Sequence, residues 1–107
     1  MAIGNSDEIR DVVRKYYESL LNAGFPLEKV VLFGSYAKNK QNTNSDIDVA
    51  VVLKKFKSDR FSTRLELMKY SRGFKEVIEP HPFLVSEFEI SNPFVLEIMT
   101  TGVELYS

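Results

Sequence analysis

The chain has 107 residues, of which 44% are apolar and 27% are charged, and its formal net charge is −1. This length and composition indicate one folded domain spanning residues 1–107, and they argue against a disordered chain. The near-neutral charge gives no sign of direct nucleic-acid binding. Because the sequence has no cysteine, no signal-peptide pattern and no apolar run long enough to cross a bilayer, we expect a soluble cytoplasmic protein without a membrane contact.

The first predicted element is an amphipathic helix. Apolar residues recur at three- and four-residue spacing between residues 9 and 21, which is typical of one helical face. Gly24 and Pro26 end this pattern. The adjacent Tyr16 and Tyr17 lie in the apolar stripe, so we interpret them as core or interface residues rather than as reactive groups.

A turn between strand and helix is predicted next. Residues 30–33 are apolar and indicate a buried strand, which ends at Gly34 and Ser35. Residues 36–38 can begin a short helix, whose free backbone N–H groups would suit a phosphate. Glycine lets the backbone approach a ligand closely, the serine adds a hydroxyl, and Lys38 adds a positive charge.

Two acidic residues open the following strand. Ten residues separate Ser35 from Asp46, and Asp46 and Asp48 precede the apolar segment 49–53. Side chains two positions apart in a strand point to the same face. Two carboxylates this close repel each other unless cations lie between them, and carboxylate oxygens suit Mg²⁺. The pair therefore indicates a magnesium site.

A second helix is expected over residues 60–71. Its residues Phe61, Leu65 and Met68 have the spacing of one helical face, and we expect that face to pack on the sheet. Gly73 ends the pattern.

The last third of the chain predicts a strand, a helix and a closing strand. Residues 77–85 are rich in strand formers but contain two prolines, so this strand lies at a sheet edge or breaks after Glu79. Asn92 is placed to cap a helix over residues 94–101, and residues 103–106 can form the closing strand.

The segments 32–38 and 45–51, with their Gly-Ser turn and Asp-x-Asp pair, resemble the signature of the DNA polymerase β-like nucleotidyltransferase superfamily. More narrowly, they resemble the minimal nucleotidyltransferases of bacteria and archaea, many of which are encoded beside a HEPN-domain protein as a toxin–antitoxin pair. This resemblance implies an α/β (α+β) fold, with a small mixed β-sheet and helices packed on it. The predicted order of helices and strands agrees with that fold.

The resemblance also implies a third carboxylate on a neighbouring strand. Glu79 is our candidate, because it ends an apolar stretch just before two prolines and its setting resembles a variant found among minimal nucleotidyltransferases. Glu87 and Glu89 are alternatives in a segment that indicates a loop. The single histidine, His81, is expected in an extended turn near Glu79, and we leave it out of the catalytic set.

Together these residues predict an Mg²⁺-dependent nucleotidyltransferase that uses two ions and takes ATP as its substrate. Asp46 and Asp48 would bind Mg²⁺ on the triphosphate, and a second Mg²⁺ shared with Glu79 would activate the attacking hydroxyl. The residues expected to position the phosphates are Gly34, Ser35 and Lys38.

The acceptor implied by the resemblance is a tyrosine of a HEPN toxin, which AMP transfer would silence, so that this chain would be its antitoxin. Two alternatives stay open. One is a non-catalytic antitoxin that neutralises its toxin by contact, and the other is a nucleotidyltransferase that modifies small molecules such as antibiotics. The sequence also leaves self-association open.

Overall fold

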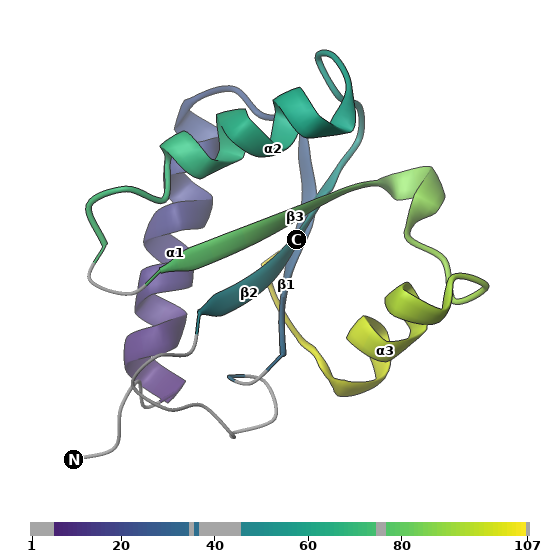
Figure 1. Cartoon of the computed structure of the whole chain (residues 1–107). Helices are drawn as coiled ribbons and strands as arrows, with labels where there is room; N and C mark the ends of the chain where they lie inside the picture. Colours follow the sequence, from purple (N-terminus) through teal and green to yellow (C-terminus); the bar gives the residue numbers. More distant parts are fainter. Residues whose placement is uncertain (1–5, 35, 37–45, 75–76, 107) are drawn as a thin grey trace.

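The computed structural model describes residues 6–34, 36, 46–74 and 77–106. Within these ranges the chain forms a mixed sheet with helices on both faces, so the expected fold class is confirmed (Figure 1). None of the described helices combines the length and apolarity needed to cross a bilayer. The elements in chain order are α1 (Ser6–Asn22), β1 (Leu27–Phe33), β2 (Ile47–Leu53), α2 (Arg60–Lys69), β3 (Ile78–Leu84), a 3-10 helix (Val85–Glu87), α3 (Pro93–Thr101) and β4 (Val103–Tyr106).

The sheet has the strand order β3-β2-β1-β4. Strand β1 pairs antiparallel with both β2 and β4, whereas β2 and β3 are parallel. In this register Phe33 at the end of β1 lies opposite Asp48, and Asp48 lies opposite Glu79. The end of β1 and the beginnings of β2 and β3 therefore meet at one end of the sheet.

The two faces of the sheet are covered by different helices (Figure 1). Along β2, Ile47 and Val49 belong to the core formed with α1 and α2, whereas Ala50 and Val52 belong to the core formed with α3. Because side chains alternate along a strand, Asp48 lies on the α3 side. Tyr16 of α1 is fully buried, which confirms its interpretation as a core residue.

Helix α2 is rotated relative to the expectation from its sequence. The residues that it buries are Thr63 and Leu67. Phe61, Leu65 and Met68 are 70%, 46% and 41% exposed, so the expectation that these three face the sheet is wrong. They leave an apolar stripe on the solvent side of the helix.

The rotation of α2 follows from its contacts with neighbouring elements. The buried Tyr16 hydroxyl donates a hydrogen bond of 2.8 Å to the carbonyl of Leu67. On the adjacent side of the helix, Arg60 donates from Nε to the carbonyl of Pro82 at 3.4 Å, and Arg64 also reaches the edge strand β3. These polar contacts fix which side of α2 faces the sheet. They cannot be predicted from the spacing of apolar residues alone.

Strand β3 lies at the sheet edge, which is one of the two expected arrangements. It runs without a break past Glu79, and His81 lies within the strand rather than in a turn. Pro80 and Pro82 are two positions apart, so the backbone nitrogen and carbonyl of both prolines point to the same side of the strand. Since the carbonyl of Pro82 accepts from Arg60, that direction is the free edge, where a missing N–H costs no ladder bond.

Candidate active site

Four of the residues singled out in the sequence come together where the three strand ends meet. Gly34 follows β1, Asp46 directly precedes β2, and Asp48 and Glu79 are the second residues of β2 and β3. Asp48 and Glu79 are register partners. The two other predicted phosphate contacts, Ser35 and Lys38, lie outside the described residues.

Gly34 and Asp48 are in direct contact. Gly34 has a φ of 76°, a left-handed conformation that glycine adopts without the penalty of other residues. A Cβ at this position would lie 2.4 Å from Oδ2 of Asp48. The turn after β1 is therefore packed against a carboxylate, and only glycine leaves room for it.

Glu79 lies within reach of both aspartates. Partial burial raises the pKa of its carboxyl group above the ordinary value, and a hydrogen bond with Asp46 and the negative charge of Asp48 raise that pKa further. One guanidinium nitrogen of Arg64 lies 3.5 Å from Oε1 of Glu79. The pKa of Glu79 stays raised beside this contact, with burial as the largest cause.

The alternative carboxylates have other surroundings. Glu87 lies in the 3-10 helix beyond the far end of β3, where it pairs with Arg60 and accepts a hydrogen bond of 3.0 Å from the backbone N–H of Leu84. The Arg60 contact, followed by this backbone bond, lowers the pKa of Glu87. Glu89 follows on the same side of the molecule and lines the groove described below.

His81 is the residue that the sequence argument left out. Its Nε2 lies 3.2 Å from Oδ1 of Asp48, and its ring packs edge-on against Phe33 with centroids 5.1 Å apart. The signal was present in the sequence, because Glu79 and His81 are two positions apart in a strand and must share a face. The prolines on either side obscured that strand.

The donor atoms in this cluster fit a divalent cation. One ligand atom each from Asp48, Glu79 and His81 can be chosen so that all three lie within 4.8 Å of one another. Besides partial burial, the neighbouring Asp46 and Asp48 raise the pKa of Glu79, so the negative charge gathered here favours compensation by a positive charge. A cation between the carboxylates would provide it.

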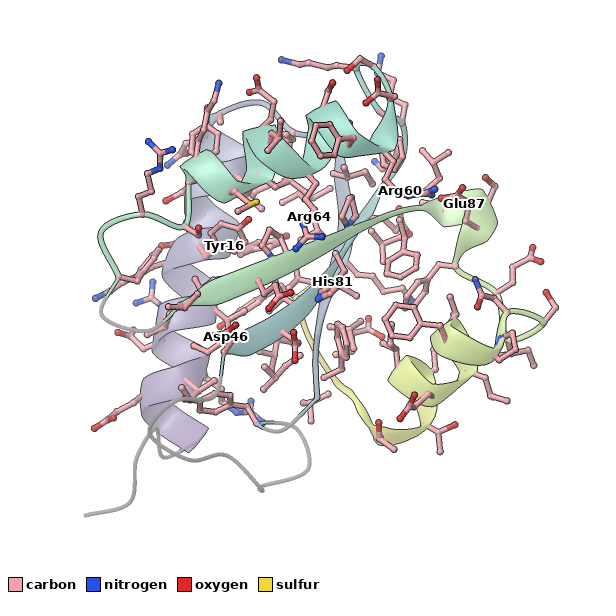
Figure 2. All side chains as sticks on the ribbon, in the orientation of Figure 1. Tyr16, Asp46, Arg60, Arg64, His81 and Glu87 are labelled. Carbon is pink, nitrogen blue, oxygen red and sulfur yellow. The ribbon has the colours of Figure 1, made fainter. Side chains whose placement is uncertain are left out.

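A groove of about 870 Å³ begins beside this cluster and extends along β3 toward α3. Its walls include the two arginines of α2, Arg60 and Arg64, as well as His81, Phe61 and Phe94. In Figure 2, Asp46 lies near the start of β3 and the Arg60–Glu87 pair lies at its far end, with Arg64 and His81 between them. The three carboxylates do not line the groove, but His81 and Arg64, which contact Asp48 and Glu79, do, and the groove has both aromatic and cationic surfaces.

Comparison with known proteins identifies the family. Residues 16–107 match the family model for polymerase beta nucleotidyltransferases, and the chain belongs to this family. The resemblance of the Gly-Ser and Asp-x-Asp segments is thereby confirmed, and the protein is a nucleotidyltransferase.

Two relatives from Methanocaldococcus jannaschii cover most of the chain. MJ1379 is 32% identical over 88 residues, and MJ0128 is 30% identical over 88 residues. Each alignment spans 82% of this chain and 84% of the relative. Both relatives bear the provisional name of protein adenylyltransferase.

Crystal structures of toxin–antitoxin proteins share the fold. The complex MntA–HpeT, in a form with two aspartates replaced by glutamates, matches with a TM-score of 0.64 and 25% identity. A toxin–antitoxin structure with AMP-PNP matches with a TM-score of 0.57 and 24% identity. Both matches cover 88% of this chain and 72% of the other chain.

Proposed function

We propose that this protein is an Mg²⁺-dependent adenylyltransferase that moves AMP from ATP to a tyrosine hydroxyl of a partner HEPN toxin and thereby acts as an antitoxin. The observation that carries the proposal is the cluster of Asp46, Asp48 and Glu79 against the turn at Gly34. The provisional name of the relatives as protein adenylyltransferases supports the reaction. The toxin–antitoxin neighbour at 25% identity supports the biological setting.

In this proposal the three carboxylates divide the work. Asp46 and Asp48 would hold a cation beside the triphosphate, and Asp48 and Glu79 would hold a second one. Bound divalent cations supply charge neutralisation for the leaving pyrophosphate and acidify the acceptor hydroxyl. Glu79 would accept the proton of the acceptor hydroxyl as the hydroxyl oxygen attacks the α-phosphorus and pyrophosphate leaves.

The groove beside the cluster suits a protein acceptor. It opens next to His81 and Arg64, and Arg64 contacts Glu79. Its aromatic residues Phe61 and Phe94 can pack on a tyrosine ring, because aromatic pairs favour edge-on and offset contacts. A tyrosine hydroxyl that enters along this groove would reach the cluster from the side of Glu79.

The test is the mass of the partner after incubation with ATP and Mg²⁺. We expect a HEPN partner protein to gain one AMP unit when it is incubated with the wild type. Glu79→Gln should reduce the rate about 10²–10⁴-fold, since it removes a general base, and Asp48→Asn should abolish transfer. Glu104→Gln is the matched control, because Glu104 lies on β4 at the opposite edge of the sheet and pairs with Lys29.

Absence of an AMP adduct on the partner with the wild type would overturn the proposed acceptor. Neutralisation of the toxin that survives both Asp48→Asn and Glu79→Gln would instead identify a contact-only antitoxin. Transfer of AMP to small hydroxyl compounds, with none to the partner, would identify the small-molecule enzyme. Full activity of both variants on the partner would remove the carboxylates from the reaction.

A further inference from the structure

We propose that His81 is a direct ligand of the divalent cation, through Nε2, and that it makes the site favour a transition-metal ion such as Mn²⁺ over Mg²⁺. This inference rests on the proposed function insofar as it takes the carboxylate cluster as a cation site. It goes further, because it assigns a nitrogen ligand and an ion preference to a site for which the sequence predicted only carboxylate ligands.

The distances around His81 are close to those of ligands that share one ion. Metal–ligand distances of about 2.1 Å place neighbouring ligands of an octahedral ion about 3.0 Å apart and opposite ligands about 4.2 Å apart. Nε2 of His81 lies 3.2 Å from Oδ1 of Asp48. One ligand atom each from Asp48, Glu79 and His81 can be chosen so that all three lie within 4.8 Å of one another. A small contraction of this triangle would therefore bring all three atoms into one coordination sphere.

The fold holds the imidazole in this place. In the parallel ladder Asp48 lies opposite Glu79, and the next inward-facing pair is Ala50 with His81. Alanine leaves room beside the ring. Phe33 and Phe94 pack edge-on against it, with centroid distances of 5.1 and 6.3 Å. The imidazole is consequently oriented before any ion binds, and less ordering remains for the binding step.

A nitrogen ligand changes which ion the site favours. Carboxylate oxygens suit Mg²⁺ and Mn²⁺ alike, so they give little preference between the two ions. An imidazole nitrogen binds transition-metal ions better than it binds Mg²⁺, so a histidine ligand adds a preference for Mn²⁺. A histidine that served only to position Asp48 would donate a hydrogen bond to the carboxylate and touch no ion. The two roles differ in one observable, which is the presence of nitrogen in the first coordination sphere.

The sequence makes this observable unambiguous, because His81 is the only histidine in the chain. In tag-free protein, pulsed electron paramagnetic resonance on bound Mn²⁺ should show coupling to an imidazole ¹⁴N. The coupling should be absent in His81→Gln, whose amide can still donate to Asp48, and it should persist in Glu104→Gln. The samples would contain Mn²⁺ alone and Mn²⁺ with a non-transferable ATP analogue.

Titrations of both ions provide a second measurement. We expect His81→Gln to weaken Mn²⁺ binding about tenfold or more and to change Mg²⁺ binding less than about threefold. The inference would be overturned if the wild type showed no nitrogen coupling, or if it bound no Mn²⁺ either alone or with the ATP analogue. It would also be overturned if His81→Gln lost the same affinity for Mn²⁺ and for Mg²⁺. If His81→Gln failed to fold, the wild-type spectrum alone would decide.

These readouts are independent of AMP transfer. Imidazole coupling in a protein that modifies no partner would support the metal assignment and contradict the proposed function. Transfer by a protein whose bound Mn²⁺ shows no nitrogen coupling would do the reverse.

Discussion

At the scale of single residues, the candidate site depends on how closely Gly34 approaches Asp48. The left-handed φ of Gly34 and the 2.4 Å between its missing Cβ and the carboxylate are separate constraints. The first concerns only the backbone, whereas the second concerns the position of a functional side chain. Gly24 has a φ of 89° and no heavy atom within 4 Å of its missing Cβ. A substitution at Gly24 therefore tests the left-handed backbone alone, without a contact to a functional side chain.

We expect Gly34→Ala and Gly24→Ala each to destabilise the protein by about 1–2 kcal/mol, because both force alanine into a left-handed conformation. Gly34→Ala should cost more than Gly24→Ala, because its methyl group also meets Asp48. Only Gly34→Ala should lose AMP transfer, by about tenfold or more, since the new methyl group must push the Asp48 carboxylate aside. Urea unfolding and the partner-mass assay measure the two effects. Equal activity of the two variants would show that the contact between Gly34 and Asp48 has no functional role.

At the scale of helices and strands, the sequence was informative where one periodic pattern acted alone. Three- and four-residue spacing predicted α1, and the Asp-x-Asp alternation placed two carboxylates together. The pattern failed for α2, because hydrogen bonds from other elements set its rotation. It was ambiguous for β3, where two prolines obscured an unbroken strand and with it the proximity of His81 to Asp48.

The rotation of α2 has a testable consequence for partner binding. Its exposed apolar stripe adjoins the groove through Phe61, so we expect it to contact the partner. Leu65→Ser should weaken the complex about tenfold while changing the free energy of unfolding by less than about 0.5 kcal/mol. Leu96→Ser on α3 is the control, because Leu96 is 47% exposed and Leu65 is 46% exposed. Calorimetric titration with the partner should separate them, and equal affinities would refute the contact.

At the scale of the whole molecule, the carboxylates of the candidate site lower the stability of the fold that holds them. Apolar side chains pack against both faces of the sheet, whereas three carboxylates lie close together at one end of it. A raised pKa for Glu79 means that the folded protein holds a proton there more tightly than the unfolded chain. The contribution of Glu79 to folding stability therefore falls as the pH rises from its ordinary pKa through the raised value.

This linkage predicts how stability responds to pH and to cations. In EDTA at about pH 8, Glu79→Gln should be more stable than the wild type, and the difference should vanish at about pH 4. Saturating Mn²⁺ or Mg²⁺ should stabilise the wild type more than the variant, because the ion relieves the repulsion. Urea unfolding at both pH values, with and without the ion, measures this. A variant that is less stable than the wild type in EDTA throughout this pH range would contradict the prediction.

The prolines of β3 have a further consequence for how other chains can meet this one. An edge strand with free N–H groups invites an added strand from another molecule. Pro80 and Pro82 remove two such donors from the outer side of β3, and Arg60 already occupies the carbonyl of Pro82. Regular β-augmentation along this edge is thereby blocked. A partner that binds on this side of the protein must therefore be recognised by side chains. Such side chains can differ between related proteins and their partners without altering the sheet that holds the carboxylates.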